Sequence, residues 1–217
     1  MRELQLPLDA LRWLPQALRL RRRHTTRPRH VMLLPGFGAD ERSMAVLRLY
    51  LRRVGHVVAD WGQGRNTGRL GRLLPALKAR VQEQVLAAGE PIVLVGWSLG
   101  GYLAREIARD HPQWVRKVVT LGSPVVGGPR YTAVSLWYRL RGHDLRRVED
   151  QVAGRYATPL RVPVAAIWSR RDGVVAWRAC VDRWSPHVRD IEVSETHLGL
   201  AFAPSVLAVV ADEVERD

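Results

Sequence analysis

The sequence predicts an α/β protein in which a mostly parallel sheet of about six strands carries helices on both faces. Short, almost continuously apolar runs alternate along the chain with longer amphipathic stretches. This alternation is typical of parallel strands that are buried on both faces and joined by crossover helices. The length of 217 residues suits one domain with a sizeable core.

The individual elements are predicted from the apolar periodicity of each segment. The interval 124–161 is too long for a plain crossover, so we expect an insertion there, with a helical stretch at 133–140. Strands are expected at 30–35, 56–60, 91–96, 115–122, 162–169 and 188–194, and helices at 43–54, 69–88, 99–110, 176–183 and 203–215.

Residues 1–29 are predicted to form an amphipathic, basic segment ahead of the domain at 30–217. Such a segment would either lie on an anionic membrane surface or cover the protein's own core, and the second is commoner in globular proteins. No apolar run reaches the length of a membrane span, and charged residues and prolines interrupt the first 16 residues. We therefore expect a cytoplasmic protein.

The charge balance is strongly basic. Lysine and arginine number 34 against 21 acidic residues, which gives +13, and only Lys78 and Lys117 are lysines. This charge favours anionic partners, or it reflects a bias towards arginine. No nucleic-acid-binding motif accompanies it, so no nucleic-acid partner is expected. Cys180 is the single cysteine, which excludes an internal disulfide and gives no support for a thiolate metal site.

The stretch VLVGWSLGG at 93–101 ends a predicted strand in a serine that has glycines on both sides. Ser98 follows the carboxyl end of this strand, where open parallel sheets form their sites. A strand that turns into a helix within a few residues strains the central residue and leaves no room for side chains beside it. Gly96 and Gly100 supply that room. In its strand-turn-helix context, this G-x-S-x-G pattern favours a nucleophilic serine over a tight structural turn.

A serine hydroxyl needs a base to take its proton and an acid to orient that base. Among the seven histidines, only His197 follows the last predicted strand in a loop that can reach Ser98, although a structural loop histidine is the alternative. Asp172 lies just beyond the strand at 162–169 and is the predicted acid. The less well placed acids are Asp182, Asp190 and Glu195.

Two backbone amides are expected to bind the oxyanion of the reaction. Leu99, at the start of the helix after Ser98, would supply one. Phe37 would supply the other, because Gly36 lets the chain turn closely at the end of the first strand. A glycine-rich turn into the next helix is the alternative for this loop.

Together, these residues resemble the α/β-hydrolase superfamily, and within it the small bacterial esterases and lipases. The resemblance rests on PGFG, GWSLGG, SRRDGVVAW and SETHLGL, and it covers most of the chain from about residue 30. It implies a catalytic triad of Ser98, His197 and Asp172. Pro35 stands where the family often has a histidine before the oxyanion glycine, which makes the assignment of Phe37 weaker than that of Ser98.

The resemblance also implies that residues 124–161 form a short helical cap over the site. Aromatic and apolar residues of this cap and of the rim would line an acyl pocket, although aromatic residues at helical spacing are as often simple core. The predicted substrate-binding residues are Trp97, Trp137, Tyr138, Val175 and Trp177.

The expected activity is hydrolysis of carboxylic esters that have an apolar acyl group, with no metal and no organic cofactor. A thioesterase or acyltransferase is the alternative enzyme, with arginines of the insertion holding an anionic carrier. A non-catalytic membrane-associated protein is the alternative outside enzymes. The arginines concerned are Arg130, Arg139, Arg141, Arg146 and Arg147.

Overall fold

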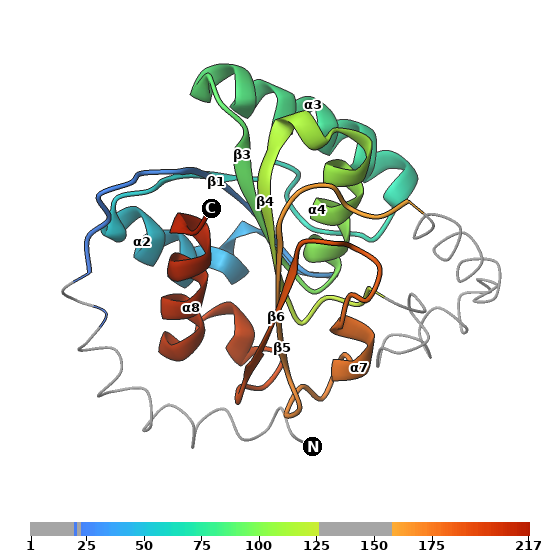
Figure 1. The fold of residues 1–217 in the computed structure, drawn as a ribbon. Coiled ribbons are helices and arrows are strands. Elements are labelled where there is room, and N and C mark those ends of the chain that lie inside the picture. The colour runs from blue at the N-terminus through green and yellow to red at the C-terminus, as the bar shows by residue number, and fades with distance from the viewer. Residues whose placement is uncertain (1–19, 21–22, 126–157) are drawn as a thin grey trace.

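Six parallel strands form one sheet in the order β2-β1-β3-β4-β5-β6 (Figure 1). The structure, a computed structural model, describes residues 20, 23–125 and 158–217. All six predicted strands are confirmed, each to within two residues at either end. Their bounds are β1 His30–Leu34, β2 Val57–Asp60, β3 Ile92–Trp97, β4 Val115–Leu121, β5 Val164–Ser169 and β6 Val188–Val193.

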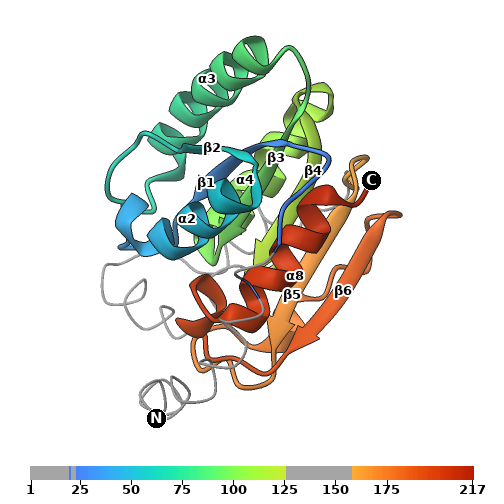
Figure 2. The same cartoon turned by 90° about the vertical axis from the view of Figure 1, so that its left-hand side faces the viewer.

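Helices cover both faces of this sheet (Figures 1 and 2). The helices α2 (Ala45–Val54) and α8 (Pro204–Glu215) lie on one face, and α3 (Leu70–Ala88) and α4 (Leu99–Asp110) lie on the other. Alternate residues of each strand enter opposite cores, as the period of two requires. Along β1, for example, Val31 and Leu33 pack with α2 and α8, whereas Met32 and Leu34 pack with α3 and α4.

The helix expected at 176–183 is shorter than predicted. The helix α7 covers only Trp177–Cys180, and the backbone of Val181 is already extended. The cause is the side chain of Asp182, whose Oδ1 accepts hydrogen bonds from the amides of Trp184 and Ser185 and so folds a turn at this point.

Asp182 also forms a buried ion pair with α4. Its Oδ2 lies 2.5 Å from NH2 of Arg105 on α4, and both side chains are almost fully buried. Burial opposes ionisation of the Asp182 carboxyl group. The guanidinium of Arg105 and the hydrogen bonds that the carboxylate accepts outweigh this effect and hold the pKa of Asp182 below the ordinary value. The pair therefore ties the loop before β6 to α4.

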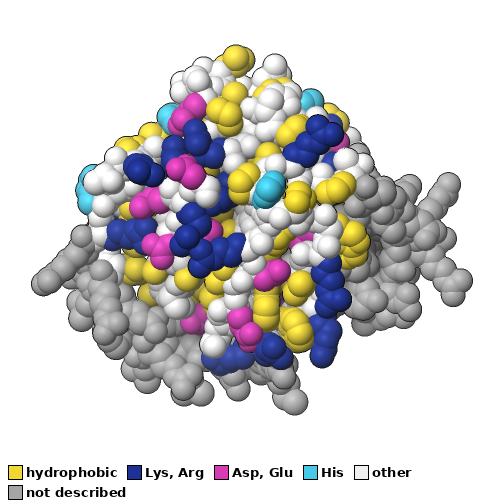
Figure 3. Space-filling view, in the orientation of Figure 1, with side chains coloured by type: hydrophobic (Ala, Val, Ile, Leu, Met, Phe, Trp, Pro, Cys, Tyr) yellow, Lys and Arg dark blue, Asp and Glu magenta, His cyan; other side chains and the backbone are white. Residues whose placement is uncertain are grey.

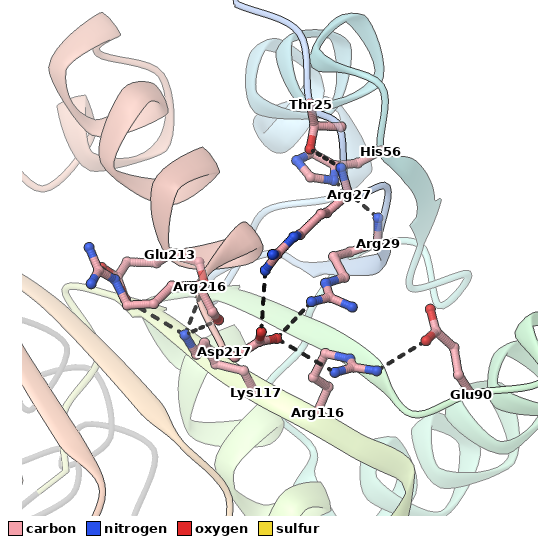
Figure 4. Close-up of polar contacts among 10 residues, drawn as sticks. All are labelled: Thr25, Arg27, Arg29, His56, Glu90, Arg116, Lys117, Glu213, Arg216 and Asp217. Atoms are coloured by element: carbon pink, nitrogen blue, oxygen red, sulfur yellow. Dashed lines mark hydrogen bonds and ion pairs between the residues drawn. The ribbon is translucent and has the colours of Figure 1, made fainter.

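The end of α8 is anchored at the amino ends of the strands (Figure 4). The carboxylate of Asp217 accepts a hydrogen bond from Arg29 and lies 3.6 Å from Arg27 and 3.9 Å from Arg116. Nζ of Lys117 on β4 donates to the backbone carbonyls of Glu213, in the last turn of α8, and of Arg216, just after it, and burial lowers the pKa of this lysine. This polar cluster lies at the edge of the sheet opposite to the strand carboxyl ends.

Much of the basic charge in the described residues is balanced locally. Figure 3 shows lysine and arginine side chains interspersed with acidic ones. Examples are the pairs Arg48–Asp60, at 2.7 Å, and Lys78–Asp110, at 2.7 Å. Among the described residues, no helix combines the length and the apolar character needed to cross a bilayer.

Candidate active site

Ser98 occupies a strained turn between β3 and α4. Its backbone has φ 53° and ψ −121°, and it is the one non-glycine residue with positive φ in the described part of the chain. Serine at a helix start usually caps the helix with its hydroxyl. Ser98 makes no such cap bond, and the residue is partly exposed although it follows the buried strand β3. The hydroxyl is therefore not used for capping, and the strain is of the kind that proteins keep at functional sites.

The glycines of the G-x-S-x-G pattern are required by close backbone packing at this turn. A Cβ atom on Gly96 would overlap the backbone of Gly100 and Gly101, where α4 begins. A Cβ on Gly100 would overlap the carbonyl of Leu34, at the end of β1. The turn was predicted from the sequence on this same ground, that the positions beside the serine have no room for a Cβ atom.

His197 and Asp172 form a buried hydrogen-bonded pair. Nδ1 of His197 lies 2.7 Å from Oδ2 of Asp172, and the two side chains are 5% and 1% exposed. The other carboxylate oxygen, Oδ1, accepts the amides of Val174 at 2.8 Å and Val175 at 2.7 Å. A carboxylate only accepts hydrogen bonds, so Nδ1 carries the proton and Nε2 is left as the acceptor.

The carboxyl ends of neighbouring strands bring this pair beside the serine turn. The amide of Ser98 donates to the carbonyl of Leu121, at the end of β4. The next residue, Gly122, lies so close to the pair that an added Cβ would be 2.8 Å from Oδ2 of Asp172 and 3.1 Å from Nδ1 of His197. The turn that carries Ser98 and the His197–Asp172 pair therefore lie at the same edge of the sheet.

The loop after β1 packs against the serine turn. A Cβ on Gly36 would be 3.1 Å from the ring of Trp97 and 3.2 Å from Cβ of Ser98. Phe37, the next residue, is partly exposed. Leu99 is the first residue of α4, where a helix leaves its amides without intrahelical acceptors. The loop after β1 and the start of α4, which were predicted from the sequence to supply the oxyanion donors, therefore both lie next to Ser98.

Asn66 holds the loop after β1, and this role was not predicted from the sequence. The residue is completely buried. Its side-chain amide donates to the carbonyl of Pro35 at 2.9 Å, its backbone amide donates to Ala39, and its backbone carbonyl accepts from Gly38. In the sequence, Asn66 lies in the glycine-rich loop after β2, where asparagine normally indicates only a turn.

The predicted pocket residues have varied surroundings. Val175 is 1% exposed and contacts the acid through its backbone amide. The ring of Trp177 stacks on Trp168, with centroids 5.1 Å apart, and the guanidinium of Arg178 lies 4.6 Å from its centroid. Trp97 is buried, and its indole N–H donates to the carbonyl of His197. Trp137 and Tyr138 lie outside the described residues, as does most of the expected cap.

The rejected acids and histidines lie in other surroundings. Glu195 accepts a hydrogen bond from the hydroxyl of Ser205, and Asp182 pairs with Arg105. His111 stacks on Trp114 at the end of α4, and His56 is buried at the amino edge of the sheet. Among the described residues, no group of three or more His, Cys, Asp or Glu side chains is arranged to hold a metal ion.

The sequence model of the alpha/beta hydrolase family matches residues 31–216, which is most of the chain. The chain belongs to this family. Two curated relatives are pimeloyl-[acyl-carrier protein] methyl ester esterases. The one from Klebsiella pneumoniae (strain 342) is 31% identical over 126 residues, covering 57% of this chain and 46% of the relative. The one from Proteus mirabilis (strain HI4320) is 28% identical over 132 residues, covering 58% and 47%. The match thus spans less than half the length of either relative.

Solved structures of other proteins share the fold. A monoacylglycerol lipase from Paleococcus ferrophilus superposes with a TM-score of 0.65 at 16% identity, covering 88% of this chain and 96% of the lipase. The thioesterase domain from the curacin biosynthetic pathway gives a TM-score of 0.60 at 14% identity, covering 88% and 92%. At such low identity these two structures establish the architecture alone.

Proposed function

We propose that this alpha/beta hydrolase cleaves carboxylic esters through a covalent acyl-enzyme. The observation that carries the proposal is the strained backbone of Ser98 at a strand end that adjoins the buried His197–Asp172 pair. Membership of the family, and the esterase names of two relatives, support the same reaction class. The substrate is proposed to be a small-molecule ester with an apolar acyl group.

In this mechanism Oγ of Ser98 attacks the ester carbonyl carbon while Nε2 of His197 takes the hydroxyl proton. Asp172 orients the imidazole and stabilises its cation. The amides of Phe37 and Leu99 bind the developing oxyanion. The C–O bond to the alcohol then breaks, and His197 returns the proton to the leaving oxygen. Water, activated by the same imidazole, releases the carboxylic acid and restores Ser98.

The proposal is tested by hydrolysis of p-nitrophenyl esters of increasing acyl length. Wild type is expected to turn over the series, and Ser98→Ala is expected to lose activity on every member. Ser185→Ala is a suitable control, because the hydroxyl of Ser185, in the loop before β6, accepts a structural hydrogen bond from the amide of Leu160. Turnover that survives in Ser98→Ala would overturn the assignment.

A thioesterase or acyltransferase that acts on an anionic carrier is the second candidate. The names of the two relatives refer to an acyl-carrier protein, and the chain has a net charge of +13. Salt screens exposed charge contacts. If this candidate is right, added salt raises KM for phosphate-bearing thioesters much more than KM for neutral esters. If added salt changes KM equally for both kinds of substrate, the second candidate is excluded and the ester hydrolase remains.

Membrane contact through residues 1–29 and a cytoplasmic location stay predictions. The first is tested by sedimentation with anionic liposomes, comparing the full chain with a variant that lacks residues 1–29. Loss of pelleting in the shortened chain would support membrane contact, and equal pelleting would dismiss it.

A further inference from the structure

The side chain next to the proposed nucleophile holds the backbone of the proposed base. Trp97 ends β3 and directly precedes Ser98. Its indole Nε1 donates to the carbonyl oxygen of His197 at 3.0 Å, across a separation of 100 residues. The two rings also contact each other, with centroids 5.4 Å apart and planes inclined by 35°.

His197 needs such support because it lies in a loop between β6 and the 3-10 turn η5 (Gly199–Ala201). Within the loop, the side-chain oxygen of Thr196 accepts the amide of Gly199, and the carbonyl of Thr196 accepts the amide of Leu200. These bonds fix the residues beside His197. The bond from Trp97 fixes His197 itself.

The hydrogen bond to Asp172 leaves the imidazole one rotation that must also be restrained. A single bond at Nδ1 allows the ring to pivot about that bond, which would move Nε2 relative to Ser98. The ring contact from Trp97 opposes this pivot, and the bond to the carbonyl fixes the backbone that carries the imidazole. Trp97 is also rigid, since it is 8% exposed and packs in the core between the sheet, α2 and α8.

We propose that Trp97 is a positioning residue, which holds His197 in register with Ser98 through its indole N–H. This inference rests on the proposed function, because it assigns a role within that reaction. It gives Trp97 a task other than the pocket lining that the sequence predicted. Tryptophan suits the task because its indole combines a large apolar ring with a donor that cannot also accept.

The test replaces Trp97 with phenylalanine, which keeps an aromatic ring and removes the donor. The expected result is a roughly threefold to tenfold fall in kcat for p-nitrophenyl esters with KM unchanged, the range expected for losing one neutral hydrogen bond in the reacting arrangement. The second readout is the downfield proton resonance of Nδ1 in the His197–Asp172 pair, assigned by its absence in His197→Ala. In Trp97→Phe this resonance should broaden through faster exchange with water.

Trp61→Phe is the matched control for the resonance. The indole of Trp61 is also fully buried and also donates to a loop carbonyl, that of Gly64 at 3.1 Å. Trp61→Phe removes the same kind of hydrogen bond without touching His197, so the Nδ1 resonance should stay as sharp as in wild type. If Trp97→Phe does not fold, Trp97→Leu, which also has no side-chain donor, is measured on the same resonance.

The outcomes separate this inference from the proposed function. A broadened resonance in the Trp97 variant alone supports positioning by Trp97. A resonance that is equally sharp in Trp97→Phe and wild type overturns it, whatever the activity. An absence of ester hydrolysis in wild type would overturn the proposed function, while the resonance would still report whether Trp97 holds His197.

Discussion

Oδ2 of Asp172 lies 2.7 Å from Nδ1 of His197, while Oδ1 of the same carboxylate accepts two backbone amides. This division fixes both the orientation of the acid and the position of the imidazole proton. The pair therefore offers a direct way to test the mechanism without removing either side chain.

Asp172→Asn is expected to remove the His197 tautomer in which Nδ1 carries the proton and Nε2 accepts. With the amide oxygen still on the amides of Val174 and Val175, the amide nitrogen would face Nδ1, so the imidazole proton moves to Nε2 and that atom can no longer accept from Ser98. We expect kcat for ester hydrolysis to fall about 10⁴-fold. A fall of less than about tenfold, in a variant whose melting temperature is close to that of wild type, would argue against Asp172 as the acid.

Gly122→Ala is expected to disturb both stability and activity. Its φ is +54°, and the new Cβ would lie 2.7 Å from Leu200 and 2.8 Å from Asp172. Gly89→Ala is the matched control, since Gly89 has φ +68° with no atom within 4 Å of the added Cβ. The control should lose about 1–2 kcal/mol from the backbone conformation alone. Gly122→Ala should lose more in urea unfolding and should also lower kcat; equal losses with full activity would contradict the crowding seen at the pair.

Ser98→Gly and Ser98→Ala should differ in stability although both lose the hydroxyl. Glycine adopts positive φ without cost, whereas alanine keeps the Cβ that strains the turn at φ 53°. We expect the glycine variant to unfold at higher urea concentration, with a free energy of unfolding about 1–2 kcal/mol greater. Greater stability of the alanine variant would show that the turn is not strained.

His56 should make the protein less stable in mild acid. The residue is buried, its Nδ1 accepts the amide of Arg29, and Nε2 lies 3.7 Å from Glu215. Burial lowers its pKa below 6.5, against the opposing charge of Glu215. In the window below pH 6.5 and above the folded pKa, the unfolded chain binds the proton and the folded chain does not.

The free energy of unfolding should therefore decrease as the pH is lowered through this window, by up to about 1.4 kcal/mol per pH unit. His56→Asn keeps an acceptor for Arg29 and removes the titration. The difference between the two proteins in urea unfolding should shrink as pH falls from 7 to 5. A difference that stays constant over this range would exclude His56 as the cause.

The elements that local pattern determines could be predicted from the sequence. Each strand is an apolar run, and the turn at Ser98 follows from glycines that leave no Cβ where β3 meets α4. The helix predicted at 99–110 has the same bounds as α4. Asp172 and His197 were placed by their position after successive strands, and the structure brings them into contact; their catalytic roles stay predictions.

What the sequence did not predict depends on partners that are distant along the chain. The turn that ends α7 is folded by local hydrogen bonds of Asp182, but Arg105, which pairs with this carboxylate and allows it to be buried, lies 77 positions earlier. Asn66 acts on a loop that is about 30 residues away, and Trp97 acts on a carbonyl 100 residues away. Neither bond leaves a periodic signal, because a backbone carbonyl accepts a donor regardless of its own side chain.

The central claim is most directly tested by locating the site of covalent labelling. Wild type treated with a fluorophosphonate ester and digested should give one phosphonylated peptide, modified at Ser98, with hydrolysis lost in proportion to labelling. Ser98→Ala should give no adduct. An adduct on another residue, or full labelling of wild type that leaves ester hydrolysis intact, would contradict a nucleophilic serine at the end of β3.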